Sequence, residues 1–474
     1  MKTNVPSGIF RGYDLRGIAD TELTKEHVEA LAAGYATYLL SRRIYDTVVG
    51  HDCRISSPRI HNVVVETLLD AGITVYDIGH TLSQMAYFAQ YLFRTKGMIM
   101  ITASHNPREY NGMKLGTGFS QTMETEEIVD FRNLVQSGEF VKSGKNGMHH
   151  TEDIYQAYED DLFRRVKEDE IGTFKIVVDA CNGSTGPFLP KILRRAGCEI
   201  IEQNTKPDGN FPLGTPDPTE KDVLERLANR VKKENADLGL AYDTDGDRIG
   251  IVDNEGSLIW NDILVSIFAR DILHTAKGAP IVFNTLCSKQ VSEVIQEMGG
   301  KPVIWMTGHS FIKAKVKEVN APFGGELSGH FFFMDNFYGH DDGAIASLRL
   351  LSYLSRQHKT LKEAVSELPH YVSSPEIKLG LADDIKFKLI DNEITNDLKS
   401  LYPRAKYIDI DGIRMDTDMR MAIIRASQNG PYITIKFESK DQKGYDELKK
   451  QLHDLLKKYD QIKFNEGVNI HAFE

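Results

Sequence analysis

Short runs of apolar residues recur along the chain, and three of them open segments that share one outline. Each segment starts with an apolar run, passes through a polar loop that contains a cysteine, and enters a stretch with helical periodicity. A glycine stop and a second apolar run follow, as expected for a helix that ends in a left-handed cap. The segments span residues 47–76, 175–201 and 280–305. Continuous apolar strands are typical of sheets covered on both faces, so the pattern predicts three related strand–helix–strand units.

A polar, glycine-rich loop follows each of these units at the end of a strand. The three loops cover residues 102–114, 242–248 and 324–330. Loops at strand ends carry the chemistry of most α/β folds. These loops are therefore the first candidates for a functional site.

The same pattern divides the chain into four domains, at residues 1–150, 151–254, 255–370 and 371–474. A linker is predicted at 141–147, and a helix over 154–166, capped by Thr151–Asp153, should open the second domain. The last domain has alternating strands at 407–410 and 433–437 and an amphipathic helix from Tyr445 to Tyr459. We therefore predict an α/β fold: three tandem related α/β domains with mixed sheets, plus a smaller C-terminal α+β domain.

Composition excludes several classes of protein. The length of 474 residues favours several domains, and the net charge of −11 argues against a nucleic-acid binder. No apolar run is long enough for a membrane span, and the first residues lack a signal-peptide core. The four cysteines show no Cys-x-x-Cys pairing, which favours a reducing cytoplasm over a disulfide framework or a zinc site.

The first loop places a serine at the end of a predicted buried strand, residues 98–101. Small residues precede Ser104, so other groups have access to its hydroxyl. Serine is a weak nucleophile, and His105 and Lys114 on the same loop are candidates to help it carry a covalent intermediate. For an isolated Ser-His pair, a plain polar turn is the more common outcome.

The second loop carries Asp243, Asp245 and Asp247 between two predicted strands. Three carboxylates this close repel one another unless a cation lies among them, and oxygen ligands favour Mg²⁺ or Ca²⁺. An EF-hand loop is excluded, since its sixth position should be glycine and is Arg248, and its twelfth should be glutamate and is Asn254. A magnesium site that binds phosphate, with Arg248 as a charged fork, is the main prediction; a solvated acidic turn is the alternative.

In the third loop, Glu326, Ser328 and His330 alternate along the chain. On extended backbone, alternation directs the three side chains to one side, where they would recognise a polyol such as a sugar ring. A surface strand is an equally plain explanation. A second histidine, His309, lies at another strand end and is a candidate proton carrier.

Two further segments are candidates for phosphate binding. Arg425, Ser427 and Asn429 lie in a loop between strands and would form an anion nest, although an ordinary hairpin has the same composition. Near the start of the chain, Tyr13 and Arg16 lie between glycines. They belong either to a network of proton-transfer groups or to an ordinary surface turn. The His149–His150 pair is discounted, because it falls in the linker without a third ligand.

Together and in this order, these loops resemble the α-D-phosphohexomutase superfamily, in its phosphomannomutase/phosphoglucomutase branch. The motifs are Thr102-Ala103-Ser104-His105-Asn106-Pro107, Asp243-Thr244-Asp245-Gly246-Asp247-Arg248 and Gly325-Glu326-Leu327-Ser328-Gly329-His330. The resemblance covers essentially the whole chain. It implies four domains around a central cleft and an isomerase of carbohydrate metabolism that interconverts hexose 1-phosphate and hexose 6-phosphate, for mannose or glucose.

The resemblance also implies roles for the candidate residues. Ser104 is carried as a phosphoserine, and the phosphate passes to the sugar and back through a bisphosphorylated intermediate. Mg²⁺ is held by a phosphoserine oxygen and by Asp243, Asp245 and Asp247. The proton-transfer and charge-stabilising groups are Arg16, Lys114, His309 and His330. The implied substrate-binding groups are Tyr13, Arg248, Glu326, Ser328, Arg425, Ser427 and Asn429. A hexose 1,6-bisphosphate would prime the enzyme, and its partners are small sugar phosphates, with no nucleic acid or membrane, for a monomer or weak homo-oligomer.

Three positions depart from the usual motifs. Asn429 replaces a threonine in the phosphate loop, and Leu286 replaces a lysine that contacts sugar. Leu327 replaces the usual methionine, where the phosphoglucosamine branch has glutamine. A phosphoglucosamine mutase and a non-catalytic Mg²⁺ or sugar-phosphate binder therefore stay as alternatives.

Overall fold

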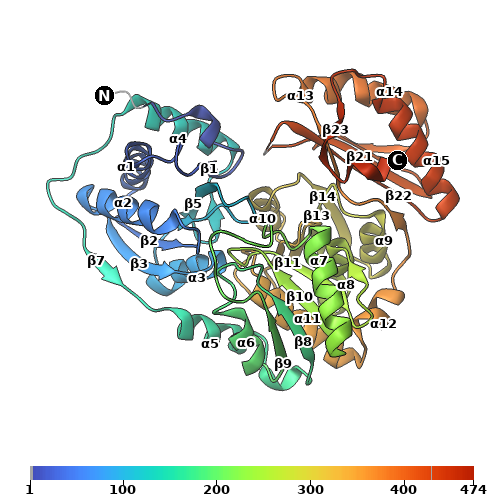
Figure 1. The fold of residues 1–474 in the computed structure, drawn as a ribbon, viewed down its shortest axis with the longest axis horizontal. Coiled ribbons are helices and arrows are strands. Elements are labelled where there is room, and N and C mark those ends of the chain that lie inside the picture. Colours follow the sequence, from blue (N-terminus) through green and yellow to red (C-terminus); the bar gives the residue numbers. More distant parts are fainter. Residues whose placement is uncertain (1–3, 429, 474) are drawn as a thin grey trace. The chain divides into compact units, whose positions relative to one another are not determined.

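The computed structural model describes residues 4–428 and 430–473, in two compact units. The N-terminal unit comprises Met1–Asn261 and Ser328–Ala364, and the C-terminal unit comprises Asp262–Leu327 and Val365–Glu474. Figure 1 shows the elements coloured along the chain. Within the described residues, no helix has both the length and the apolar composition needed to cross a membrane.

The first sheet of the N-terminal unit has the strand order β1-β5-β4-β2-β3-β7, with β6 beside β5. Its strands are β1 Leu15–Ile18, β2 Asp46–His51, β3 Thr74–His80, β4 Gly97–Ile101, β5 Tyr110–Gly118, β6 Gln121–Thr122 and β7 His149–Thr151. The helices are α1 Lys25–Ser41, α2 Ser57–Asp70, α3 Ser83–Phe93 and α4 Thr125–Ser137. Helices α1, α2 and α4 share a core with Val49 and Ile99 of the strands, and α3 packs on β2 and β4 (Figure 1).

The second sheet of this unit has the order β12-β11-β10-β8-β9 and is also mixed. Its strands are β8 Lys175–Asp179, β9 Glu199–Gln203, β10 Leu238–Tyr242, β11 Ile249–Asp253 and β12 Leu258–Ile259. The helices are α5 Tyr155–Arg165, α6 Leu189–Arg195, α7 Lys221–Glu234 and, from the later part of the chain, α11 Gly343–Gln357. The short strand β16 Phe331–Phe333 and helix α12 Leu361–Ser366 flank α11 along the chain.

The C-terminal unit contains two different sheets. In the first, the parallel strands are ordered β14-β13-β15. These strands are β13 Pro280–Asn284, β14 Lys301–Trp305 and β15 Phe323–Gly325, with helices α8 Asn261–Thr275, α9 Lys289–Glu297 and α10 His309–Glu318. This arrangement is the third α/β domain that the sequence predicts.

The second sheet of the C-terminal unit is antiparallel, with the order β19-β20-β21-β22-β18-β23 and β17 beside β22. Its strands are β17 Val372–Ser373, β18 Ile377–Gly380, β19 Lys406–Ile408, β20 Ile413–Asp416, β21 Arg420–Ala426, β22 Tyr432–Ser439 and β23 Lys463–Val468. The helices are α13 Lys386–Lys388, a π-helical turn at Leu389–Ile394, α14 Thr395–Leu401 and α15 Gln442–Leu456. Helix α15 packs on β22 over an apolar core.

The predicted fold class is confirmed, including the three repeats. Each repeat is a strand, a cysteine loop, a helix, a glycine stop and a parallel strand, in β2–α2–β3, β8–α6–β9 and β13–α9–β14. The three stop glycines have φ values of 85°, 89° and 74°, at Gly72, Gly197 and Gly299. This left-handed conformation carries no steric cost for glycine, which is why the stops recur at these points.

Some element bounds differ from the prediction. The last helix runs from Gln442 to Leu456, three residues earlier than expected at both ends, because the Asp441 side chain accepts from Gly444 N and caps it there. It is followed by β23, which the sequence pattern did not reveal. Helix α5 begins at Tyr155, whose N–H donates to Asp153 Oδ1 at 3.1 Å.

The His149–His150 pair lies on strand β7 rather than in a linker. β7 runs parallel to β3, and Asp77 of β3 accepts from His149 Nε2 at 3.1 Å and contacts His61 Nε2 at 2.8 Å. Burial of the carboxyl is outweighed by these imidazoles and by the Gly79 N–H, so the pKa of Asp77 is lowered to about 2. The pair therefore has a structural role, in attaching β7 to the sheet.

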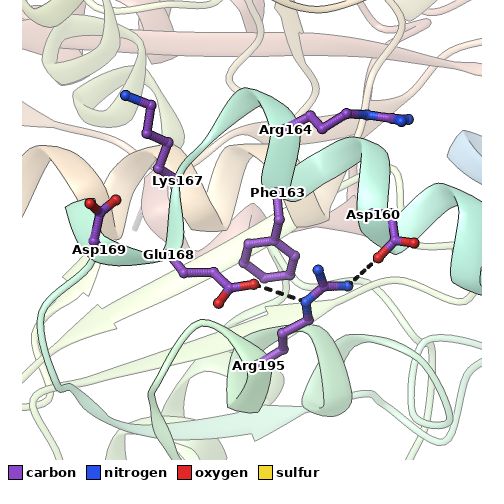
Figure 2. A pocket seen from close by; sticks show the side chains of 7 residues that line it. All are labelled: Asp160, Phe163, Arg164, Lys167, Glu168, Asp169 and Arg195. Carbon is purple, nitrogen blue, oxygen red and sulfur yellow. Dashed lines mark hydrogen bonds and ion pairs between the residues drawn. The ribbon is translucent and has the colours of Figure 1, made fainter.

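An open hollow of about 560 Å³ lies beside α5 and α6 and is lined mainly by charged side chains (Figure 2). Arg195 points into it and donates to Asp160 Oδ1 at 2.7 Å and to Glu168 Oε1 at 3.0 Å. Its guanidinium carbon also lies 4.6 Å from the centre of the Phe163 ring. These contacts join the end of α6 to α5 and to the short turn that follows α5, and they form an ion-pair cluster at the surface.

Candidate active site

Ser104 lies just beyond the end of β4, on a turn with strained backbone. Its φ is +49°, in the left-handed region that residues other than glycine rarely adopt. The Ser104 N–H donates to Thr102 Oγ1 at 2.8 Å, and the side chain is buried. Non-glycine residues held in this conformation cluster at functional sites, and the turn fixes the direction of the hydroxyl.

The Ser104 hydroxyl contacts the acidic loop of the second sheet. Ser104 Oγ donates to Asp243 Oδ2 at 2.8 Å and lies 3.2 Å from Nδ1 of His105. His105 Nε2 is 3.8 Å from Asp217 Oδ2, beyond hydrogen-bond distance. Two loops separated by more than a hundred residues therefore form one site in the N-terminal unit.

Arg54 carried no predicted role, yet it holds the Ser104 turn in place. Its terminal nitrogens donate to four carbonyl oxygens at 2.6 to 3.1 Å, those of Ser104, Asn106, Pro107 and Tyr110. Its Nε donates to Asp52 Oδ2 at 3.1 Å. The side chain is fully buried, and burial lowers the pKa of the guanidinium although Asp52 opposes this. The fork geometry of arginine suits a turn that offers several carbonyls at once.

Substituting methionine for Arg54 should destabilise the N-terminal unit. The change leaves four carbonyls without their donor and leaves the buried Asp52 carboxylate unpaired. Breaking a buried ion pair costs about 3–5 kcal/mol, which corresponds to a drop of roughly 6–20 °C in melting temperature for a domain of about 150 residues. Differential scanning calorimetry measures this drop.

The matched control for Arg54→Met is Arg108→Met, which removes an exposed ion pair on the same loop. An exposed pair contributes about 0–1 kcal/mol, so this control should melt almost as the unaltered protein does. Equal melting of the two variants would show that Arg54 does not stabilise the turn.

The acidic loop joins the antiparallel strands β10 and β11. Its three aspartates are buried, and each offers one carboxylate oxygen within 4.8 Å of the others. The N–H of Gly246 donates to Asp243 Oδ1 at 3.0 Å, which folds the loop back on itself. The predicted cluster of Asp243, Asp245 and Asp247 is thus brought together at the Ser104 turn.

Lys114 lies on strand β5, rather than on the Ser104 loop as predicted, and its ammonium group contacts the acidic cluster. Lys114 Nζ donates to Asp245 Oδ2 at 2.9 Å and also to Asp247. Burial would lower the pKa of Lys114, but the two carboxylates raise it well above its usual value. In turn, Lys114 outweighs the effect of burial on Asp245 and holds its pKa below the usual range.

The electrostatic environment of Asp243 disfavours the charged form of its carboxyl. Burial, followed by repulsion from Asp245 and Asp247, raises its pKa well above the usual value. Buried Oδ1 atoms of Asp245 and Asp247 accept no hydrogen bond from any described residue. An excess of buried negative charge with oxygen atoms left over is what a hard divalent cation satisfies. The residues present therefore fit a magnesium ion.

Arg16 and Tyr13 lie at the same turn. Arg16, on β1, donates from Nη1 to Asn106 Oδ1 at 2.6 Å and from Nε to Asp14 Oδ2 at 2.8 Å. Burial opposes its charge, but Asp14 and then Tyr13 raise the pKa of Arg16. The segment is therefore a buried part of the site and not a surface turn.

The third loop does not have the extended backbone that was predicted. Residues 326–330 form a turn between β15 and β16, in which Gly329 has a φ of +91°. On this turn, alternate positions do not direct Glu326, Ser328 and His330 to one side, so that prediction is wrong. A side chain at Gly329 would place a Cβ only 2.4 Å from the carbonyl oxygen of Ile249, so the turn packs tightly on β11.

His330 joins the site of the N-terminal unit after this turn, and Ser328 lies half-buried before it. Arg248 Nε donates to His330 Nε2 at 2.8 Å, and His330 Nδ1 lies 2.8 Å from Asp341 Oδ2. Arg248 is thereby held beside the acidic loop.

The C-terminal unit holds the remaining predicted residues. Glu326 Oε1 accepts from Gly308 N at 2.8 Å, directly before His309, the first residue of α10. Arg425 and Ser427 are buried at the end of β21. Asn429 lies outside the described residues. The unit therefore brings Glu326 close to the turn that carries His309.

Several residues of the site were missed by sequence reasoning. Besides Arg54, Ser83 donates to Asp245 Oδ2 at 2.5 Å from the start of α3, and Asp411 accepts from Arg425 Nε at 2.8 Å. Arg54 and Asp52 share a conspicuously polar loop after an apolar strand, which is a usable signal. Ser83 and Asp411 carry none, because only the tertiary fold brings them to their partners.

Models of three domains of one protein family together match most of the chain. They are the alpha/beta/alpha domains I, II and III of phosphoglucomutase/phosphomannomutase, matched at residues 7–141, 153–256 and 260–371. The chain is similar to the phosphomannomutase/phosphoglucomutase of Pseudomonas aeruginosa, with 34% identity over 458 residues, 96% of this chain and 97% of that one. It is also similar to a phosphoglucomutase of Neisseria gonorrhoeae, with 33% identity over 440 residues, 93% of this chain and 94% of that one.

A comparison with solved structures points to the same family. A phosphoglucomutase/phosphomannomutase family protein from Burkholderia thailandensis superposes with a TM-score of 0.87 at 29% identity, covering 96% of this chain and 98% of that one. The sequence and the fold of this chain therefore both match this family over nearly the whole length.

Proposed function

The chain belongs to the phosphoglucomutase/phosphomannomutase family and is a phosphohexomutase, and we propose that it interconverts the 1- and 6-phosphates of mannose or glucose through a phosphoserine at Ser104. One observation carries the proposal: the strained Ser104 turn presents its hydroxyl to the buried aspartate cluster, 2.8 Å from Asp243. Phosphoryl transfer depends on positioning and charge neutralisation, and this arrangement offers both.

In the proposed reaction, the phosphoryl group moves twice. A hydroxyl oxygen of the sugar attacks phosphorus as the bond to Ser104 Oγ breaks, and the hydroxyl proton leaves to a nearby base. The resulting hexose bisphosphate reorients, and Ser104 Oγ attacks its other phosphate, taking that phosphoryl group back. Phosphate is conserved over the cycle, so a hexose 1,6-bisphosphate would prime protein that has lost it.

The side chains of the N-terminal unit supply charge for this transfer. Asp243, Asp245 and Asp247 would hold Mg²⁺ together with an oxygen of the phosphoserine. When bound, the ion neutralises charge on the transferring group. Lys114, which contacts Asp245 and Asp247, and Arg16, which donates to Asn106 next to the Ser104 turn, would stabilise the remaining charge.

We propose that Arg425, Ser427 and Asn429 of the C-terminal unit bind the phosphate that is not reacting, and that Glu326 and Ser328 recognise sugar hydroxyls. His309 and His330 are the proposed proton carriers, and Tyr13 and Arg248 contact the substrate. All four cysteines are free thiols, which supports the proposal that the protein works in the reducing cytoplasm. We propose a monomer or weak homo-oligomer whose partners are sugar phosphates and not nucleic acids.

A comparison of substrates tests the preferred sugar. Mannose 1-phosphate, glucose 1-phosphate and glucosamine 6-phosphate are offered to the Mg²⁺-loaded, bisphosphate-primed protein. We expect turnover of mannose or glucose phosphate to exceed that of glucosamine phosphate at least about tenfold in kcat/KM. Faster turnover of glucosamine phosphate would identify a phosphoglucosamine mutase. Binding of all three without turnover would identify a non-catalytic relative.

A further inference from the structure

Asp411 lies in the turn between β19 and β20 and is buried against Arg425. The next residue, Gly412, has a φ of +74°, and a Cβ there would lie 2.4 Å from the Ile424 oxygen and 2.7 Å from Arg425 Cα. Only glycine permits so close an approach. The turn is therefore built to press directly on the backbone of the proposed phosphate-binding arginine.

A single oxygen of Asp411 accepts three hydrogen bonds. Its Oδ2 accepts from Arg425 Nε at 2.8 Å, from Thr285 Oγ1 at 3.0 Å and from Thr307 N at 2.9 Å. These donors come from β21, from the loop after β13 and from the turn before α10. A carboxylate is a stronger acceptor than a neutral oxygen, so it holds three elements at one point.

The turn before α10 links Asp411 to the proposed sugar-recognition residue. The N–H of Thr307 donates to Asp411, and the N–H of the next residue, Gly308, donates to Glu326 Oε1 at 2.8 Å. His309 follows directly and begins α10. Two consecutive backbone amides of this turn thus donate to two carboxylates. One is that of Asp411, beside Arg425, and the other is that of Glu326, the proposed sugar-recognition residue.

We propose that Asp411 is a positioning residue that orients Arg425 toward the distal phosphate of a hexose phosphate and ties it to the Glu326 and His309 turn. The proposal rests on the proposed function and assigns the Nε–H of Arg425 to Asp411. The phosphate monoester is then bound through the terminal nitrogens of the guanidinium, in one fixed plane. Fixing that plane favours bidentate binding, because little freedom is lost when the phosphate arrives.

The charge of Asp411 and its proposed positioning role predict opposite effects on phosphate binding when Asp411 is removed. A carboxylate beside Arg425 repels an incoming phosphate, so its neutralisation would tighten phosphate binding if Asp411 did nothing else. Positioning predicts weaker binding, since the guanidinium and the Thr307 turn lose their common anchor. The sign of the change therefore separates the two explanations.

The test measures steady-state isomerisation of glucose 1-phosphate by the full chain carrying Asp411→Asn. Losing one charge-assisted hydrogen bond weakens distal phosphate binding about tenfold, so we expect KM to rise about tenfold while kcat stays within about threefold. Calorimetry with glucose 6-phosphate, in a Ser104→Ala background that blocks turnover, should show the same loss of affinity. Thr285→Val, which removes one donor to Asp411, should raise KM about two- to threefold.

The control is Asp397→Asn, which removes an exposed ion pair with Lys458 in the same domain and should leave KM and kcat unchanged. A KM that is unchanged or lower in Asp411→Asn, or a loss confined to kcat, overturns the proposal. If Asp411→Asn fails to fold, Thr285→Val decides by the same criterion. Absence of isomerisation in the unaltered protein would instead refute the proposed function, while the calorimetric comparison would still test Asp411.

Discussion

Replacing Ser104 with alanine should abolish isomerisation of hexose phosphates, with a fall in kcat of at least about 10³-fold. The variant lacks the hydroxyl oxygen that is proposed to accept and return the phosphoryl group. Binding should persist, because the groups of the C-terminal unit that are proposed to grip the distal phosphate are unchanged. Coupled-enzyme assays measure the rate, and calorimetry measures the retained binding.

The control for Ser104→Ala is Ser143→Ala, a serine of the exposed linker whose hydroxyl donates to the carbonyl oxygen of Lys145 in its own turn. This control should be as active as the unaltered protein. Intact-mass measurement adds an independent readout, since active protein should carry one phosphoryl group and Ser104→Ala should carry none. Full activity without phosphate, and without a bisphosphate primer, would contradict the phosphoserine.

The repeats and the acidic loop were predictable because both follow from local sequence. An apolar strand, a helical period and a glycine stop act within about 30 residues, and the three stops adopt the left-handed caps that glycine favours. Asp243, Asp245 and Asp247 lie on one short hairpin, so their proximity needs no tertiary information. The family resemblance adds the link between this loop and Ser104.

Arg54 and Asp411 were not predictable for the opposite reason. Arg54 donates to carbonyls 50 to 56 residues away, and Asp411 accepts from residues as distant as Thr285. Backbone carbonyls and amides exist at every residue and leave no trace in the sequence. Their partners become visible only when the fold brings the loops together.

In the third loop, a glycine overrides the alternating pattern of polar residues. Alternation of Glu326, Ser328 and His330 suggested a strand, but glycines occupy 325 and 329. Gly329 takes a left-handed φ, so the chain turns and the alternating pattern has no geometric meaning there. A glycine inside a predicted strand was the signal against extended backbone.

Removing the divalent cation should have an effect as large as removing Ser104. We expect a chelator to abolish isomerisation and added Mg²⁺ to restore it. Asp245→Asn should lower kcat about 10²–10³-fold even at high Mg²⁺, because an amide replaces a charged ligand of the ion. Asp245 Oδ1 is buried and accepts no hydrogen bond from the described residues, which leaves it suited to a metal.

A thermal readout separates loss of the metal from loss of the fold. Mg²⁺ at about 100 times its dissociation constant should stabilise the unaltered protein by about 2.7 kcal/mol, and Asp245→Asn should lack this increment. The metal-free variant should still fold, because Lys114 keeps its contact with Asp247. Asp237→Asn, an exposed aspartate just before β10 in the same domain, should keep both the increment and the activity. Equal stabilisation of Asp245→Asn and the unaltered protein by Mg²⁺ would place the ion elsewhere and would contradict the aspartate site.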